Sequence, residues 1–480
     1  MKKSITKNYM YNLIYQMLVL ILPLITTPYI SRVLGAENIG IYSYTISIST
    51  YFILFGSLGI AMYGQREIAY LQEKKEAYSK TFWEIVILRF ITMAISIAIF
   101  CITFVKGEQY QTYYAILVLE LFANCLDISW FFAGLEEFKK TVIRNIAVKI
   151  ISIICIFLFI KTQDDLVYYF VIYVLSTMIG NVSLWAYLPK YLKKVKFSSL
   201  NVVKHLKPTI ALFIPQIAMQ IYTVLDKVMI GTIIIDKAEV GFYEQSQKVV
   251  KMLLAIVTSL GTVMLPRMAN AFVGSDREKI SGYMKKSFNF VFLIAFPIIF
   301  GIIAVSDSFV PIFFGNGYAR VSLLIKVISP IILIIGLSNV IGIQYLLPTK
   351  RQTEFTVSVI VGAVINFIVN MLLIRTYGAL GASIGTVIAE IFVTLVQFVF
   401  VRNDFNIKEI IKLSTKYVIS AIVMFIACSV IGMLINNNLY SIIIQVLVGI
   451  LTYVSCLLLL KDSFTYSILN KVIGRLKHEI

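Results

Sequence analysis

Charged residues are scarce in this sequence of 480 residues. Asp, Glu, Lys and Arg make up 14% of the chain, whereas globular proteins contain about 25%. Hydrophobic residues make up 59% of it. A soluble fold with so little charge could not cover its own surface, so the composition excludes a soluble enzyme. The apolar content suffices instead for about fourteen membrane spans of ~20 residues each.

Residues for several kinds of chemistry are equally scarce. The two histidines, His205 and His478, both fall in basic segments, which argues against a histidine triad, haem ligation or a histidine metal site. No glycine-rich phosphate loop occurs, so we do not expect ATP hydrolysis. The five cysteines fall in apolar runs without paired metal-ligand spacing, as packing thiols do: Cys101, Cys125, Cys155, Cys428 and Cys456. We therefore expect no cofactor and no metal, apart from a transported proton or sodium ion.

Long loops are absent as well, and the apolar runs between the short connections predict an all-α polytopic membrane protein. No connection exceeds about 20 residues, which leaves no extramembrane catalytic domain. The first run lacks a small-residue cleavage site and is expected to be retained. We predict spans at 12–30, 41–61, 81–104, 113–133, 146–160, 166–188, 209–234, 249–266, 288–310, 321–347, 356–374, 381–401, 417–435 and 440–460.

The basic residues sort to one side of these spans. Of the 43 lysines and arginines, 32 lie in the N-terminus and every second connection thereafter, eight in the opposite connections and three within spans. This bias predicts a cell membrane protein with both termini cytoplasmic. It also explains the net charge of +18 without a nucleic-acid partner, since a basic inner face favours anionic membrane lipids.

Some charges nevertheless fall inside the spans, where each costs a few kcal/mol. Span seven places Gln216, Gln220, Thr223 and Lys227 on one helical face, and span twelve carries a comparable polar stripe. Such stripes either hydrogen-bond neighbouring helices or line a water-filled cavity, and charged stripes on several helices favour the cavity. The charged residues expected inside spans are Glu84, Arg89, Glu120, Asp127, Asp226, Lys227, Lys326 and Glu390.

Glycine spacing and a short internal repeat indicate how the helices are organised. Gly378, Gly381 and Gly385 have the spacing that allows close helix packing. The segments 35–42 and 237–243 share Ala-Glu, an aliphatic residue, Gly, an apolar residue and Tyr. Because six spans separate them, the halves are expected to be parallel repeats. We predict a six-helix lobe at 1–200, a second at 201–405, and two further helices with a cytoplasmic tail at 406–480.

These segments also carry a family resemblance that extends over nearly the whole chain. The sequence is similar to Wzx-type polysaccharide repeat-unit flippases, in the multidrug/oligosaccharidyl-lipid/polysaccharide exporter superfamily. The stretches that carry the resemblance are PYISRVLG at 28–35, YGQRE at 63–67, FIPQ at 213–216, YTVLDK at 222–227, GFYEQ at 241–245 and GTVMLPR at 261–267.

The resemblance implies two parallel six-helix lobes around a central cavity, plus two C-terminal helices. It implies movement of an undecaprenyl-diphosphate-linked oligosaccharide to the outer leaflet for capsule, exopolysaccharide or cell-wall polymer synthesis, by ion-coupled alternating access and beside membrane partners such as a polymerase. The implied or expected substrate contacts are Arg32, Arg89, Gln216, Gln220, Lys227 and Lys326. The ion-coupling candidates are Glu120, Asp127, Asp226 and Glu390.

Three other functions compete with this interpretation. A drug/cation antiporter of the related multidrug branch would be expected to have an acidic, apolar cavity, whereas basic residues are expected here. A flippase for the peptidoglycan lipid precursor would share the architecture and stays open. A membrane polymerase or ligase would be expected to carry a large outer loop, but the outer connections are short.

Overall fold

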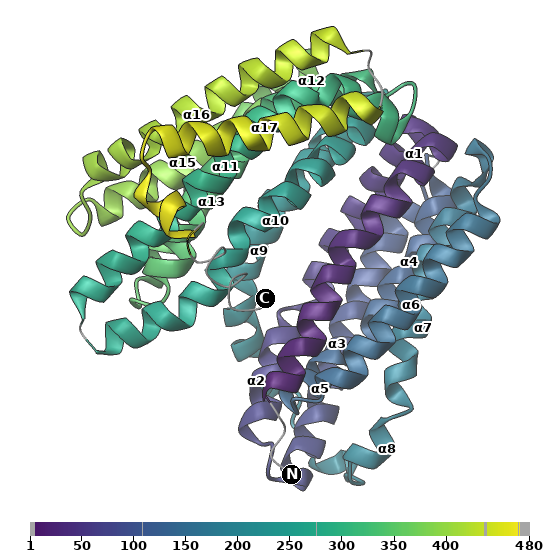
Figure 1. The fold of residues 1–480 in the computed structure, drawn as a ribbon. Helices are drawn as coiled ribbons and strands as arrows, with labels where there is room; N and C mark the ends of the chain where they lie inside the picture. The colour runs from purple at the N-terminus through teal and green to yellow at the C-terminus, as the bar shows by residue number, and fades with distance from the viewer. Residues whose placement is uncertain (1–4, 108, 275, 436–438, 469, 471–480) are drawn as a thin grey trace, which may run out of the picture. The chain divides into compact units, whose positions relative to one another are not determined.

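The secondary structure of the described residues is helical (Figure 1). The computed structural model describes residues 5–107, 109–274, 276–435, 439–468 and 470, and no strand occurs among them. The chain forms two compact units, residues 1–241 and 242–480. The predicted cytoplasmic tail lies mostly outside the described residues.

The N-terminal unit is a bundle in which α1 contacts α3, α4, α6, α7 and α9. Its α1 is bent at Gly35, whose φ of 77° and ψ of 170° are not helical. The principal helices are α1 (Ile5–Ser57), α2 (Ile60–Tyr70), α3 (Lys75–Phe100), α4 (Gln111–Cys125), α5 (Ser129–Gly134), α6 (Phe138–Phe159), α7 (Leu166–Trp185), α8 (Leu188–Tyr191) and α9 (Leu206–Ile233). Short helical turns follow or connect them at Cys101–Val105, Gln163–Asp165, Phe197–Ser199 and Val203–His205.

The C-terminal unit is built around α11, which contacts α12, α13, α16 and α17. The run predicted at 321–347 is divided, because Pro330 interrupts the helix between α12 and α13 and a π-helical turn follows at Asn339–Leu346. The helices are α10 (Ala238–Val273), which begins at the end of the N-terminal unit, α11 (Arg277–Phe314), α12 (Ala319–Ile328), α13 (Ile331–Ser338), α14 (Gln352–Tyr377), α15 (Ala379–Val401), α16 (Ile407–Leu434) and α17 (Leu439–Leu459).

Twelve helical segments among the described residues are long and apolar enough to cross a membrane. The predicted multi-pass membrane architecture is therefore confirmed, but the predicted count of fourteen is not. One segment, Ile21–Tyr70, continues past Gly35 and takes in most of the first two predicted spans, while α9, which covers the seventh, is not among the twelve. Several helices also extend beyond the predicted limits, since a helix continues outside the hydrocarbon layer where its residues permit.

The two segments of the internal repeat touch each other through their glycines. A Cβ built on Gly40 would lie 1.7 Å from the Lys237 carbonyl oxygen, and one on Gly241 would lie 2.1 Å from the Ala36 carbonyl oxygen. Only glycine allows backbones to approach so closely. Each repeat segment thus packs on the other, while the predicted lobe boundaries stay a prediction.

Glycine also explains the tight pairing of α14 with α15. A Cβ on Gly381 would lie 2.5 Å from the Leu373 carbonyl oxygen, and one on Gly385 would lie 2.2 Å from Asn370 Oδ1. Gly378, at φ 59°, forms the junction between the two helices. The predicted packing role is confirmed for Gly381 and Gly385, whereas Gly378 forms the turn.

An aromatic cluster fixes α5 against α2 and α3. Phe82, Phe131 and Phe132 are fully buried, and the Phe82 and Phe131 ring centroids lie 4.8 Å apart. Gly64 leaves room for Trp130, because a Cβ there would lie 2.4 Å from the indole ring. This packing holds the α4–α5 junction, which forms one wall of the pocket described next.

Candidate functional site: a polar pocket in the N-terminal unit

A polar pocket of about 420 Å³ opens between the end of α4 and the facing sides of α6 and α7. Helices α6 and α7 form an antiparallel pair, so the pocket residues come from the first half of one and the second half of the other. Its lining is Asn124, Asp127, Ser129, Arg144, Asn145, Val148, Lys149, Ser152, Tyr173, Ser176, Thr177, Gly180 and Asn181.

Two hydrogen bonds set the register of α6 against α7. Arg144 Nη1 donates to Asn181 Oδ1 at 2.9 Å, and Ser176 Oγ donates to Ser152 Oγ at 3.0 Å. The polar residues recur at steps of three and four along each helix, so they share the facing sides. Asn181 Nδ2 also donates to the Ala123 carbonyl oxygen at 2.7 Å, which ties α7 to the end of α4.

Arg89 supports the wall of the pocket that is formed by the α4–α5 junction. Its Nε and Nη2 donate to the Asn124 carbonyl oxygen at 3.1 and 2.7 Å, and Nη2 lies 3.8 Å from Asp127 Oδ2. Arg89 is only 3% exposed. Asp127 Oδ1 accepts a hydrogen bond from the Ser129 amide at 2.9 Å at the start of α5. Arg89 thus supports two residues of the pocket, while its own contact with a substrate stays a prediction.

The pocket combines charge with neutral hydrogen-bonding groups. Arg144 and Lys149 bring two positive charges and Asp127 one negative charge, and the amides and hydroxyls around them both donate and accept. Arginine binds phosphate and carboxylate with a planar fork of donors. Such a lining suits a ligand that has an anionic group beside hydroxyls or amides.

The other predicted residues of the N-terminal unit lie elsewhere. Glu120 is buried and accepts hydrogen bonds from Ser49 Oγ at 2.8 Å and Tyr173 Oη at 2.9 Å, so it joins α1, α4 and α7. On α9, Asp226 is buried, while Lys227 and Gln220 are half-buried.

Two further predicted substrate contacts, Arg32 and Gln216, lie on α1 and α9. Arg32 is exposed on α1, three residues before the bend at Gly35. The side chain of Gln216 lies outside the described part of the structure. The proposed roles of all these residues stay predictions.

The predicted residues of the C-terminal unit belong to separate contacts. Lys326 Nζ lies 2.6 Å from Asp307 Oδ2, an acid inside a predicted span that the sequence interpretation overlooked. Glu390 is buried on α15. Two other polar residues of α15 make hydrogen bonds to neighbouring helices: Thr386 Oγ1 lies 2.9 Å from Tyr243 Oη, and Gln397 Nε2 donates to Ser358 Oγ at 3.1 Å.

Most of the pocket residues were missed from the sequence, although Asp127 was found. Arg144 falls just before the predicted span at 146–160 and Lys149 near its beginning, so both count among the basic residues of the preceding connection. A usable signal existed, because Arg144, Asn145, Lys149 and Ser152 lie on one helical face once α6 begins at Phe138.

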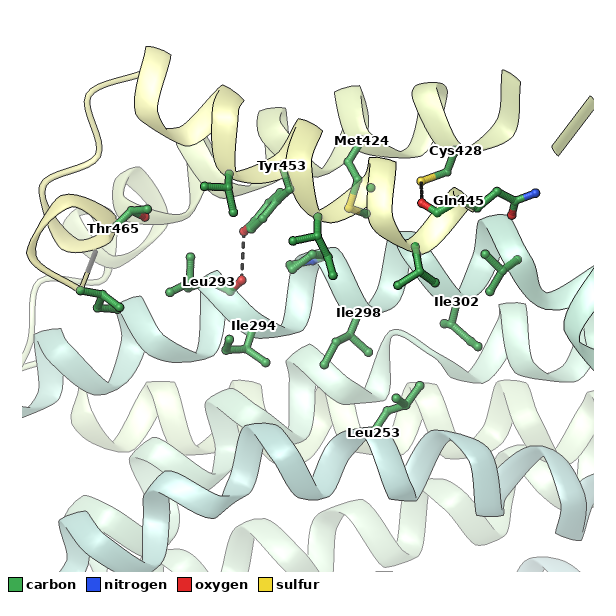
Figure 2. A pocket seen from close by; sticks show the side chains of 18 residues that line it. Leu253, Leu293, Ile294, Ile298, Ile302, Met424, Cys428, Gln445, Tyr453 and Thr465 are labelled. Carbon is green, nitrogen blue, oxygen red and sulfur yellow. Dashed lines mark hydrogen bonds between the residues drawn. The ribbon is translucent and has the colours of Figure 1, made fainter. Parts of the chain in front are cut away.

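A larger cavity of about 590 Å³ lies in the C-terminal unit, along α11 beneath α16 and α17. Figure 2 shows Leu293, Ile294, Ile298 and Ile302 on one side and Met424 and Tyr453 on the other, with Tyr453 Oη donating to the Leu293 carbonyl oxygen at 3.1 Å. Among the residues that the structure describes, no charged side chain lines this cavity. The lining of this cavity suits a hydrocarbon chain better than a charged headgroup.

Residues 5–272, more than half of the chain, match the family described as "Polysaccharide biosynthesis protein". The chain belongs to this family. The match covers α1 to α9 and most of α10, and therefore includes the whole polar pocket.

Curated relatives have names that describe transport. The protein named "Putative O-antigen transporter" of Escherichia coli K12 is 26% identical over 410 residues, which cover 84% of this chain and 98% of the relative. The "Probable low-salt glycan biosynthesis flippase Agl15" of Haloferax volcanii is 25% identical over 248 residues, half of each chain. These proteins are named as a transporter and a flippase, in agreement with the expectation that the chain is not an enzyme.

Solved structures share the fold. A structure titled "Lipid II flippase MurJ, inward closed conformation" superposes with a TM-score of 0.77 at 17% identity, covering 97% of this chain and 99% of the other. An inward-facing multidrug transporter of the MATE family superposes with a TM-score of 0.63 at 13% identity, covering 82% and 95%. The expected membrane-transporter fold is confirmed.

Proposed function

We propose that the protein is a flippase that moves a lipid-linked oligosaccharide, carried on undecaprenyl diphosphate, from the inner to the outer leaflet of the cytoplasmic membrane. The polymer built from it would be capsule, exopolysaccharide or another cell-wall polymer. The observation that carries this proposal is the polar pocket, which places Arg144 and Lys149 among amides and hydroxyls within membrane-spanning helices. The names of the relatives support the same substrate class.

In this proposal the pocket receives the headgroup. Arg144 contacts a phosphate or an acidic sugar through its guanidinium fork, and Lys149 adds a mobile charge beside it. Asn124, Asn145 and Asn181 exchange hydrogen bonds with sugar hydroxyls and amides. Two cations against one carboxylate give the lining an excess of positive charge, which favours an anionic headgroup and disfavours the cationic drugs of an antiporter.

The coupling step is assigned to the carboxylates. Asp127 is the first candidate, because it lies in the pocket lining with Oδ2 3.8 Å from Arg89 Nη2. A proton or sodium gradient would then reset the transporter through this residue or through Glu120, Asp226 or Glu390. Alternating access of the two lobes would carry the headgroup across the membrane, with both termini in the cytoplasm as the basic bias favours.

The proposal is tested in cells and with the purified protein. Deletion of the gene should leave the lipid-linked oligosaccharide facing the cytoplasm and abolish the surface polymer. In proteoliposomes, Arg144→Gln and Lys149→Gln should each slow headgroup translocation at least about tenfold, the effect of about 1.4 kcal/mol. Lys139→Gln is the matched control, because Lys139 is exposed on α6 outside the pocket.

Three results would contradict the proposal. They are a surface polymer that persists without another flippase, wild-type translocation by both pocket variants, and transport of cationic drugs in place of the oligosaccharide lipid. Transport of the peptidoglycan precursor with no activity on the oligosaccharide lipid would favour the alternative substrate.

A further inference from the structure

An apolar groove adjoins the polar pocket along the same two helices. The groove has a volume of about 420 Å³ and shares Val148 and Ser176 with the pocket. Its lining is Val148, Ile151, Cys155, Phe159, Tyr168, Val171, Ile172, Leu175, Ser176 and Ile179. Polar and apolar sites of similar size therefore meet on one helix pair.

The polarity changes in the same direction on both helices. On α6 the pocket residues end at Ser152, whereas the groove continues to Phe159; on the antiparallel α7 the groove begins at Tyr168 and the pocket ends at Asn181. Val148 and Phe159 are eleven residues apart, about 17 Å of helix. This length is close to the ~15 Å depth of hydrocarbon in one leaflet.

We propose that this groove holds the hydrocarbon chain of the lipid-linked ligand while the headgroup occupies the pocket, so that the α6–α7 pair forms one continuous amphipathic site. The inference rests on the proposed function, because the pocket supplies the headgroup. The groove is continuous with a pocket that carries Arg144 and Lys149. A ligand with an anionic headgroup on an apolar chain therefore matches both parts of the site.

The larger cavity in the C-terminal unit does not offer the same combination. It is also apolar, and the described part of the chain brings no charged side chain to its lining. A hydrocarbon chain gains little by leaving lipid for an apolar groove, since lipid tails are as apolar as leucine. The α6–α7 groove thus acts by orienting the ligand, because it holds the hydrocarbon chain in a position from which the attached headgroup meets Arg144.

The experiment blocks the groove without touching the pocket. Ile151 and Ile179 line the groove and are 59% and 62% exposed, so Ile151→Trp and Ile179→Trp fill it without disturbing the buried core. The matched control is Ile150→Trp, because Ile150 is 44% exposed on α6 and lies outside both linings.

Binding is measured on the full chain in nanodiscs with two ligands. One is the oligosaccharide on a long isoprenyl diphosphate, and the other is the same oligosaccharide diphosphate on a short alkyl chain. The groove variants should raise the Kd of the long-chain ligand about tenfold, or about 1.4 kcal/mol, and leave that of the short-chain ligand unchanged. Ile150→Trp should alter neither, and Arg144→Gln should weaken both.

The outcomes separate this inference from the proposed function. Wild-type affinity of the groove variants for the long-chain ligand overturns the inference, and so does an equal loss for both ligands. In either case the proposed function stands if Arg144→Gln still weakens both ligands. If the wild-type protein binds neither ligand, the proposed function fails and the inference fails with it.

Discussion

Arg89 and Lys149 are both cations within helices that are long and apolar enough to span a membrane, but their surroundings differ. Arg89 is buried and gives two hydrogen bonds to the Asn124 carbonyl oxygen, whereas Lys149 lies half-buried in the lining of the pocket. A buried charged donor contributes to stability, while a pocket cation contributes mainly to ligand binding. The two residues should therefore respond differently to neutralisation.

We predict that Arg89→Gln lowers both stability and translocation. Loss of charged hydrogen bonds to a buried carbonyl costs about 1.5–3 kcal/mol. Lys149→Gln should lower translocation while changing the free energy of unfolding by no more than about 0.5 kcal/mol. Thermal unfolding in detergent, compared with transport in proteoliposomes, checks both. A stable Arg89→Gln protein that lacks transport would contradict the predicted loss of stability and limit the role of Arg89 to transport.

The paired repeat glycines give a second prediction at the scale of single residues. Gly40→Ala and Gly241→Ala place a methyl group against backbone carbonyls, so the repeat segments must separate and the protein should lose about 1–3 kcal/mol of stability. Thermal unfolding measures the loss. Gly282→Ala in α11 is the control, because a Cβ there meets nothing within 4 Å. Unchanged melting of the two repeat variants would mean that the segments do not need this contact.

Charged residues inside the spans could be found from the sequence more easily than the contacts that they make with one another. Asp127 was found because a carboxylate inside an apolar run is costly, and that cost can be read from the sequence alone. Arg144 was missed because a cation two residues outside a hydrophobic window looks like a loop residue. The cavity role of Lys326 stays a prediction, but its ion pair with Asp307 on another helix could not be predicted, because that pairing depends on tertiary packing.

At the scale of helices, the beginning of α9 is fixed by a buried polar network. His205 Nε2 lies 2.9 Å from Glu84 Oε2, and Nδ1 lies 2.7 Å from Tyr63 Oη, so the ring joins α9 to α2 and α3. Lys204 Nζ also lies 2.7 Å from Glu84 Oε2. Burial, which outweighs the attraction of Glu84, lowers the pKa of His205 below its usual value. A neutral ring that donates to Glu84 and accepts from Tyr63 satisfies both contacts.

We predict that this network makes stability depend on pH. The unfolded chain takes up a proton on His205 at about pH 6.5, whereas the native protein resists protonation because its pKa is lowered. Stability is therefore complete above about pH 6.5 and declines as the pH falls below it. The melting temperature measured between pH 8 and pH 5 should fall more steeply for the wild-type protein than for His205→Gln. If the melting temperatures of the two proteins fell in parallel, His205 would not be the cause of the pH dependence.

Helix positions were largely predictable, and helix ends were not. Hydropathy marks the part of a helix that lies in hydrocarbon, so α10 and α11 extend well past the predicted spans at 249–266 and 288–310. Two helices meet at Gly35 within α1, because a single residue at positive φ is enough to make the bend between them. Such a turn has no hydropathy signal.

At the scale of the whole molecule, the distribution of basic residues predicts orientation. Because lysine and arginine are retained on the cytoplasmic side, the α6–α7 connection should face outward and the α8–α9 connection inward. Both connections present exposed residues, Asp164 in the first and Ser199 in the second. The five native cysteines fall within predicted spans, so replacing them with alanine or serine gives a background for site-directed labelling.

We therefore expect opposite labelling of two single-cysteine variants. In intact cells a membrane-impermeant maleimide should label Asp164→Cys and leave Ser199→Cys unlabelled until the membrane is permeabilised. Equal labelling after permeabilisation is the control that both thiols are accessible. This orientation places Arg144, near the start of α6, toward the cytoplasm, where a lipid-linked headgroup is collected before it is moved. The reverse labelling pattern would invert the protein and place the pocket on the side from which the headgroup should leave.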